Sequence, residues 1–256
     1  MINVKSKTEL EKMRKAGIIT GNALHYGGQS IKVGMSTYEL DKIIHDYIVK
    51  NGAKPSFLGY GGFPGSACIS INDQVIHGIP SKKKIIHDGD IVSIDVGAYI
   101  DGFHGDSAYT FPVGNVSEET LQLLKVTNES LYKGIEQAIV GNRVGDVSHA
   151  VEEHVVSYGY GIVKQYVGHG VGRNLHESPE VPNFGRSGHG PRLVAGMAIA
   201  IEPMINAVGE DVKVLSDGWT VLTKSGSPSA HFEHTIAITN GEPLILTESS
   251  LHHPKN

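Results

Sequence analysis

The stretch Ser93-Ile-Asp-Val-Gly-Ala-Tyr-Ile-Asp-Gly-Phe-His-Gly-Asp-Ser107 contains Asp95 and Asp106, two carboxylates that stand eleven positions apart. Asp95 interrupts a run of apolar and β-branched residues at positions 91–96, which predicts a buried strand. A carboxylate inside such a strand is unfavourable unless a cation meets it. Because no lysine or arginine occurs at positions 85–124, a bound metal ion is the natural candidate for that cation.

The pattern of an apolar strand followed by an acid recurs at Ala198-Ile-Ala-Ile-Glu-Pro203. Glu202 from this segment, with His169 and Glu233, completes a set of five ligand-type residues. Single members have ordinary alternatives: a turn for Asp106, a loop for His169 and an exposed strand face for Glu233. As a set, the five residues predict a metal site more strongly than any one of them does.

The composition of this set indicates the chemistry of the site. Oxygen ligands with one histidine suit first-row divalent ions better than a structural zinc site, which favours cysteines. Four carboxylates repel one another, and two divalent cations would balance their charge. Since carboxylates bridge metals, five side chains suffice for two ions about 3.5–4 Å apart, where a water becomes a hydroxide near neutral pH and attacks a carbonyl. The set therefore predicts a hydrolase.

Size, charge and cysteine content exclude several other classes of protein. The 256 residues suffice for a large core in one or two domains, and the net charge of −5 argues against nucleic acid as the main partner. The basic cluster Lys82-Lys-Lys84 is expected to be a solvated loop. A single cysteine, Cys68, excludes an internal disulfide. No apolar run is long enough for a leader or a membrane span, so we expect no membrane partner and a cytoplasmic location.

Two capping boxes mark the beginnings of helices in the first half of the chain. They are Ser6-Lys-Thr-Glu9 and Ser36-Thr-Tyr-Glu39, in which a serine precedes a glutamate by three positions. The apolar periodicity that follows each box predicts helices ending near Gly27 and Gly52. Strands and turns are predicted from about 57 to 113.

The second half repeats this order, with predicted helices at about 117–140 and 145–158 and strands to about 245. At an offset of 107 positions the halves align without a gap. Three glycines and one acid then fall on counterparts: Gly34 on Gly141, Gly52 on Gly159, Gly89 on Gly196 and Asp95 on Glu202. We interpret this as a diverged duplication that brings both acids close to a pseudo-twofold axis.

At these residues the chain resembles the methionine aminopeptidases of the bacterial, type I class. The resemblance covers nearly the full length, and the segments that carry it are Phe57-Leu-Gly-Tyr-Gly-Gly-Phe-Pro-Gly-Ser-Ala-Cys68, Ser70-Ile-Asn-Asp-Gln-Val-Ile-His-Gly-Ile-Pro80, Asp101-Gly-Phe-His-Gly-Asp106, Gly168-His-Gly-Val-Gly172, His176-Glu, Ile201-Glu-Pro-Met204 and Glu233-His-Thr-Ile236. It implies the α+β "pita-bread" fold, a curved antiparallel sheet with flanking helices. Two pseudo-symmetric halves, about 1–115 and 116–256, would form one catalytic domain.

The resemblance also implies roles for individual residues around two divalent ions. One ion would be held by Asp106, His169, Glu202 and Glu233, and the other by Asp95, Asp106 and Glu233. Glu202 would also carry the proton of the attacking water. His77 and His176 would position the scissile peptide and stabilise the developing oxyanion. The resemblance does not specify the ion, since cobalt, manganese, iron and zinc all suit such ligands.

An apolar pocket for the substrate methionine is implied as well, with walls at Tyr60, Phe63, Cys68, Leu175 and Trp219. Leu175 stands where many type I enzymes have an aromatic residue, and Gly61 replaces a larger residue. Cys68 is not expected to be a nucleophile, because the sequence fixes no base near it.

The leading hypothesis is a dinuclear aminopeptidase that removes the initiator methionine from nascent proteins when the second residue is small. It would act as a cytoplasmic monomer, with the ribosome surface as a candidate partner. A prolidase or aminopeptidase P is one alternative, although such enzymes usually carry an additional N-terminal domain. The other is a non-catalytic pita-bread protein that binds ribosomes or RNA, in which ligands would be lost.

Overall fold

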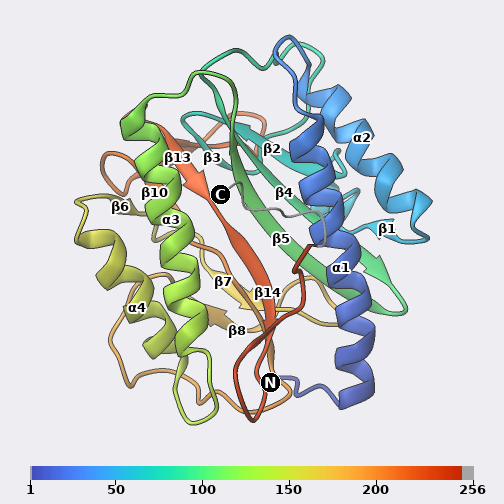
Figure 1. Ribbon diagram of the computed structural model, residues 1–256, viewed down its shortest axis with the longest axis vertical. Coiled ribbons are helices and arrows are strands. Elements are labelled where there is room, and N and C mark those ends of the chain that lie inside the picture. Colours follow the sequence, from blue (N-terminus) through green and yellow to red (C-terminus); the bar gives the residue numbers. More distant parts are fainter. Residues whose placement is uncertain (1, 250–256) are drawn as a thin grey trace.

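A nine-stranded antiparallel sheet forms the centre of the computed structural model, which describes residues 2–249 (Figure 1). Its strands follow the order β1-β4-β5-β14-β9-β7-β8, with β2 paired to β4 and β15 paired to β14. The bounds of these strands are β1 Lys54–Pro55, β2 Ala67–Ile71, β4 Ile91–Ile100, β5 Phe103–Pro112, β7 Gly168–Gly170, β8 Glu177–Val181, β9 Ala198–Ile201, β14 Glu233–Ala237 and β15 Leu244–Ile245.

Strand β14 joins the two halves of the chain in the middle of the sheet. It pairs with β5 from the first half on one side and with β9 from the second half on the other. The long β4–β5 hairpin turns at Asp101-Gly102, where both residues have positive φ angles, of 53° and 87°. An Asp-Gly pair is favoured at such a turn, because both residues tolerate positive φ angles.

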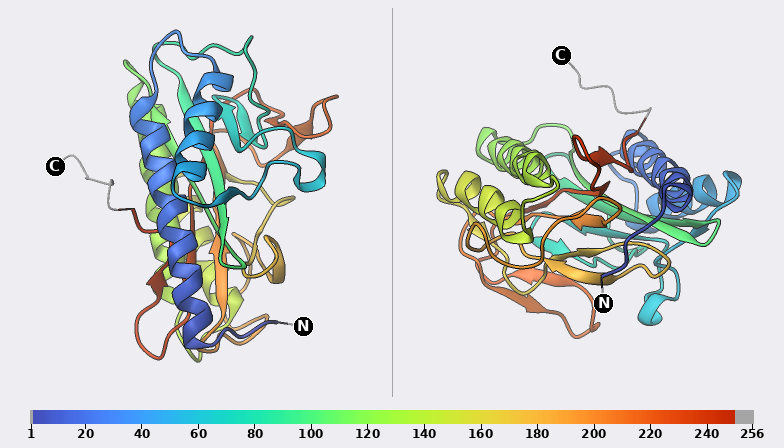
Figure 2. Two further views of the ribbon diagram at one scale, coloured as in Figure 1. Left: turned by 90° about the vertical axis from the view of Figure 1, so that its right-hand side faces the viewer. Right: turned by 90° about the horizontal axis from the view of Figure 1, so that it is seen from below.

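Four α-helices cover one face of the sheet (Figures 1 and 2). Both predicted capping boxes are present, with the backbone N–H of Ser6 donating to Glu9 Oε2 at 2.9 Å and that of Ser36 donating to Glu39 Oε2 at 2.8 Å. The first helix continues three residues beyond the predicted end at Gly27. The bounds are α1 Lys7–Ser30, α2 Thr37–Lys50, α3 Glu118–Gln137 and α4 Val144–Val156.

Two three-stranded sheets lie on the side of the central sheet away from α1 and α3 (Figure 2). One has the order β13-β10-β6 and the other β11-β12-β3. Their strands, and the short 3-10 helix η1, are β3 Gln74–Ile76, β6 Gly161–Ile162, β10 Met204–Asn206, β11 Val212–Val214, β12 Val221–Thr223, β13 Ser229–His231 and η1 Tyr60–Gly62.

Each half has its own apolar core between a pair of helices and the sheet. In the first half, α1 and α2 pack on β2 and β4 through residues such as Leu24, Ile44 and Ile94. In the second, α3 and α4 pack on β9 and β14 through residues such as Leu131, Val151 and Ile201. The helices therefore contribute stability from behind the sheet and leave its opposite face for a site.

The glycines that correspond at the offset of 107 have the same backbone conformation. Their φ angles pair as follows: 88° and 101° at Gly34 and Gly141, 77° and 76° at Gly52 and Gly159, and 90° and 93° at Gly89 and Gly196. These pairs support the duplication, which remains a proposal. We also propose that the chain is one domain, because a single sheet takes strands from both halves.

No helix within residues 2–249 combines the length and apolar character needed to cross a bilayer.

Candidate active site

Five neighbouring strands of the central sheet each bring one predicted metal ligand to the same region. Asp95 lies on β4, Asp106 on β5, Glu233 on β14, Glu202 directly after β9 and His169 on β7. Asp95 and Glu233 both stand opposite Ala108, from either side of β5. Side chains that are two positions apart on a strand point to the same face of the sheet, so Asp106 and Ala108 lie on one face. The sheet itself therefore gathers residues that are distant in sequence.

The distances between the ligand atoms are those of a metal-binding cluster. Asp106, His169 and Glu233 each offer one ligand atom, and these three atoms lie within 4.8 Å of one another. His169 Nε2 lies 3.5 Å from Glu202 Oε1 and 3.7 Å from Asp106 Oδ2. Asp106, His169 and Glu233 are buried, with exposed fractions of 3%, 8% and 2%.

Burial makes the charged carboxylates costly in the absence of a cation. It raises the pKa of Asp95 to about 7 and that of Glu202 to about 8. Burial, reinforced by the neighbouring carboxylates, raises the pKa values of Asp106 and Glu233 well above their usual range. It also lowers the pKa of His169 to about 4, so this imidazole is neutral at pH 7 and able to act as a ligand.

Three buried carboxylate oxygens of the cluster have no hydrogen-bond partner among the described residues: Asp95 Oδ1, Asp106 Oδ1 and Glu233 Oε1. Buried polar atoms are nearly always satisfied, so such a concentration of free oxygens requires an explanation. Divalent cations bind oxygen atoms and supply the positive charge that the cluster lacks. The residues present therefore fit a divalent metal centre.

His77 and His176 lie beside this cluster, as the resemblance implied. His77 follows β3 and adopts a positive φ of 58°, a strained conformation that is often found at functional positions. Burial, followed by repulsion from two other histidines, lowers its pKa to about 4. His176 ends the loop at 172–176, and its ring centroid lies 4.2 Å from that of His169. Both histidines can therefore contact a ligand bound at the cluster.

All twelve predicted site residues line one cavity of about 160 Å³, and Phe57 lines it as well. Its apolar side is formed by Phe57, Phe63, Cys68, Leu175 and Trp219, and Ile79 packs against this cluster. Cys68 stands opposite Asp95 in the β2–β4 pair, and burial, followed by the nearby carboxylates, raises the pKa of its thiol well above the usual value. The thiol therefore stays protonated, which supports its assignment to the pocket wall.

Tyr60 borders the cavity and also contacts one of the two histidines. Its side chain is 46% exposed at the edge of the cavity, and its hydroxyl lies 2.8 Å from His176 Nδ1. Tyr60 therefore orients His176 in addition to bordering the pocket. Gly61, with φ of 55°, lets this turn approach Trp219, whose ring would lie 3.2 Å from an added Cβ atom.

The sequence of the chain matches a known family over most of its length. The model of metallopeptidase family M24 matches residues 11–240. The chain belongs to metallopeptidase family M24. Membership in M24 implies divalent metal cofactors, in agreement with the carboxylate cluster described above.

Relatives within M24 define the fold and the type of enzyme. The methionine aminopeptidase of Clostridium acetobutylicum is 53% identical over 96% of this chain and 99% of its own length. The crystal structure of methionine aminopeptidase from Thermotoga maritima superposes on this chain with a TM-score of 0.95. The two sequences are 45% identical, and the match covers 97% of this chain and 100% of that one. The prolidase from Pyrococcus horikoshii is 26% identical with a TM-score of 0.78, but only 64% of it is covered. The predicted pita-bread fold is confirmed, and the chain is a metal-dependent aminopeptidase.

Two residues of this M24 site were missed by sequence reasoning. Phe57 begins the segment at 57–68 that carries the family resemblance, but the resemblance implies no pocket role for it. His231, at the end of β13, is 1% exposed, and its Nε2 lies 3.6 Å from Glu202 Oε2. No hydrogen-bond partner of this nitrogen occurs within residues 2–249. A histidine inside the buried run Ser229-Ala-His231 was the available signal, but only the fold brings it to Glu202.

Removal of metal from this M24 enzyme is expected to make its stability fall as the pH rises from 6.5 to 8.5. A carboxyl whose pKa is raised in the folded state binds its proton more tightly there, so its stabilisation is lost as the pH rises through that pKa. The pKa values of about 7 for Asp95 and about 8 for Glu202 place the loss in this range. Each group should remove about 1–2 kcal/mol from the free energy of unfolding, which lowers Tm by several degrees.

Differential scanning calorimetry with excess chelator measures this effect, and the metal-loaded protein is the reference. The range begins at pH 6.5 because the histidines with lowered pKa values, such as His169, have the opposite effect below it. Asp95→Asn is the matched variant, since it lacks one of the carboxyl groups with raised pKa values and should show a weaker dependence. A Tm that rises with pH in the metal-free protein would contradict the prediction.

Proposed function

We propose that the chain is a methionine aminopeptidase that uses two divalent metal ions to remove N-terminal methionine when the next residue is small. The observation that carries this proposal is a pocket with an apolar side directly beside five candidate metal ligands. A cavity of about 160 Å³ suits one side chain rather than a long peptide. The identity of 53% to a relative named methionine aminopeptidase supports the same specificity.

The protein's own groups would prepare the peptide for hydrolysis. Bound divalent ions lower the pKa of water and polarise a carbonyl group. Asp95, Asp106, His169, Glu202 and Glu233 would hold them. Glu202, whose pKa is raised to about 8 in the absence of a cation, is suited to accept a proton from water and return it to the leaving amine.

His77 and His176 would act on the substrate rather than on the metal. Burial lowers the pKa of both, so each is neutral near pH 7 and keeps one N–H to donate. The Tyr60 hydroxyl engages Nδ1 of His176, which leaves Nε2 for the peptide. A donor aimed at the scissile carbonyl stabilises charge that develops only in the transition state.

The two alternatives have less support. A prolidase function would correspond to relatives of lower identity, of which this chain covers less than two thirds. A non-catalytic binding module is disfavoured because all five candidate ligands and both histidines line one cavity. Cytoplasmic location and a monomeric state are part of the proposal, and the buried, unpaired Cys68 is compatible with a reducing compartment.

The proposal is tested by measuring methionine release from Met-Ala-Ser by metal-stripped protein titrated with Mn²⁺ or Co²⁺. We expect cleavage that rises with metal up to two ions per chain, and much slower cleavage of Leu-Ala-Ser and Met-Leu-Ser. The first control peptide tests the methionine pocket and the second tests the requirement for a small second residue. Absence of Met-Ala-Ser cleavage with two ions demonstrably bound would refute the proposed function.

A further inference from the structure

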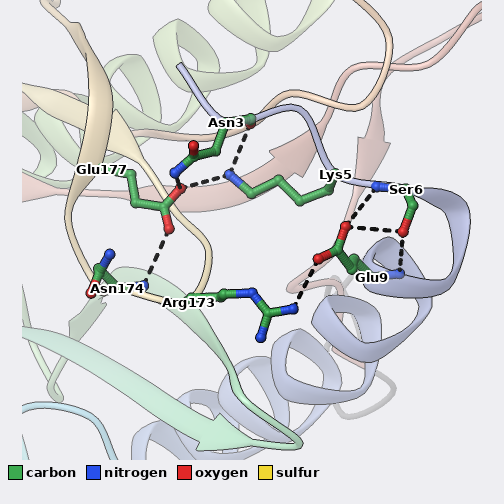
Figure 3. Close-up of polar contacts among 7 residues, drawn as sticks. All are labelled: Asn3, Lys5, Ser6, Glu9, Arg173, Asn174 and Glu177. Atoms are coloured by element: carbon green, nitrogen blue, oxygen red, sulfur yellow. Dashed lines mark hydrogen bonds and ion pairs between the residues drawn. The ribbon is translucent and has the colours of Figure 1, made fainter. Parts of the chain in front are cut away.

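We infer that Lys5 is a positioning residue for His176, because its ion pair with Glu177 holds the loop at 172–176 in place (Figure 3). Glu177 begins β8 and directly follows His176 in the chain. The inference rests on the proposed function, in which His176 contacts the peptide. It assigns a catalytic consequence to the N-terminal segment, which does not line the cavity.

The Lys5–Glu177 ion pair is buried. Lys5 Nζ lies 2.8 Å from Glu177 Oε2, and the two side chains are only 5% and 4% exposed. Lys5 Nζ also donates to the Asn3 carbonyl at 3.2 Å, and the Asn3 side chain donates to the same Glu177 oxygen at 3.2 Å. A charge buried in this way depends on its partner, since either group alone would be left uncompensated.

The Glu177 carboxylate occupies the inside of the loop. Its Oε1 accepts a hydrogen bond from the Asn174 backbone N–H at 3.2 Å. A Cβ atom at Gly172 would lie 2.5 Å from Glu177 Oε1, so any larger residue at 172 would displace the carboxylate from its present position. Burial would raise the pKa of Glu177, but the hydrogen bonds from Lys5, Asn174 and Asn3 outweigh it and lower the pKa. The carboxylate is therefore charged, and its charge is matched by Lys5.

The loop conformation sets the place of the His176 ring. The His176 ring forms a hydrogen bond with the Tyr60 hydroxyl and lies against the ring of His169. Both contacts require the backbone of the loop to hold His176 in its present position. A displacement of about 1 Å at a reacting centre lowers a rate by about 100-fold. Loss of the charge at Lys5 would allow the Glu177 carboxylate to turn towards water and would release the loop.

The backbone of Lys5 is anchored independently of its amine. Its N–H donates to the Gly196 carbonyl at 2.7 Å, and the following Ser6 caps α1. Arg173 adds an outer contact, an ion pair at 3.0 Å with Glu9 (Figure 3). Substitution of the amine alone should therefore leave the N-terminal segment in place, which makes Lys5→Met a selective variant.

The test compares Lys5→Met with wild-type protein in the metal-loaded state on Met-Ala-Ser. We expect kcat to fall by about 10–100-fold with KM and bound metal nearly unchanged, because the lost interaction acts in the transition state. Lys5→Arg, which keeps the charge, should retain most of the activity. Lys15→Met is the matched control: Lys15 also forms a 2.8 Å ion pair, with Asp101, but both side chains are about half exposed, so kcat should not change.

A double variant separates positioning from a general loss of structure. If Lys5 acts through His176, Lys5→Met should have little further effect in a His176→Ala background. An undiminished additional loss there, or a wild-type kcat in Lys5→Met, would overturn the inference. Should Lys5→Met not fold, Glu177→Gln replaces it in the same cycle, because it removes the charge and keeps an acceptor for Asn174.

An NMR measurement distinguishes failure of this inference from failure of the proposed function. The imidazole Cε1–H signal of His176 should shift in Lys5→Met, while that of His77, which lies on a different element, should not. This result does not require turnover. An unchanged His176 signal would refute the positioning role even if the protein cleaves Met-Ala-Ser, whereas inactivity of the wild-type protein would refute only the proposed function.

Discussion

Glu233→Gln is expected to lower metal-dependent cleavage of Met-Ala-Ser by about 10³-fold or more, because it removes a proposed bridging ligand. Glu233 lies on β14, between β5, which carries Asp106, and β9, which directly precedes Glu202, and Glu233 is 2% exposed. An amide of the same shape brings no negative charge to the cations. Loss of several kcal/mol of transition-state stabilisation corresponds to a rate change of this size.

Metal content after dialysis against defined Mn²⁺ or Co²⁺ should fall together with activity in Glu233→Gln. The matched control is Glu180→Gln, the same substitution at an exposed position of the same sheet, opposite His169 on β8. It should bind metal and cleave peptide as wild-type protein does. Full turnover in a Glu233→Gln preparation of wild-type metal content would remove Glu233 from the ligand set.

His77→Ala is expected to lower kcat by about 10²–10³-fold while the bound metal remains at the wild-type level. The imidazole is neutral at pH 7 because burial lowers its pKa to about 4, so the variant loses a hydrogen-bond donor rather than a charge. The positive φ at this position strains alanine much as it strains histidine, since both have a Cβ atom. The backbone contribution to stability should therefore change little.

Steady-state kinetics and metal analysis on the same His77→Ala preparation measure this effect. His87→Ala serves as the control, because the His87 side chain is 72% exposed and is not among the residues that line the cavity. A parallel loss of metal and kcat in His77→Ala would show that this histidine supports the metal centre, contrary to its proposed role on the substrate.

Much of the architecture could be predicted from local signals. The two capping boxes predicted the beginnings of α1 and α2, because a serine three positions before a glutamate satisfies orphan backbone groups whatever the tertiary context. Asp95 and Glu202 were identifiable for a different reason: an acid within or after an apolar strand requires a cation. Such signals lie within a few residues of one another.

The remaining features depend on contacts between distant segments. The proximity of His231 to Glu202 follows from the β10–β13 pairing, and nothing around residue 231 names its partner. Tyr60 and His176 are 116 positions apart in the sequence. Their contact gives Tyr60 a role besides that of a pocket wall, and only the folded structure shows it. Likewise, Lys5 and Glu177 are 172 positions apart, and their pairing could not be read from either segment alone.

The central place of β14 connects synthesis of the chain with the appearance of its activity. This strand is made late, yet it is inserted between β5 and β9, and it carries Glu233. A chain still growing on the ribosome has Asp95 and Asp106 long before it has Glu233. The two halves of the central sheet also cannot be joined edge to edge before β14 arrives, because among the described strands only β14 pairs with both β5 and β9. A truncated product that ends before residue 233 therefore lacks both the strand that joins β5 to β9 and one of the five candidate ligands.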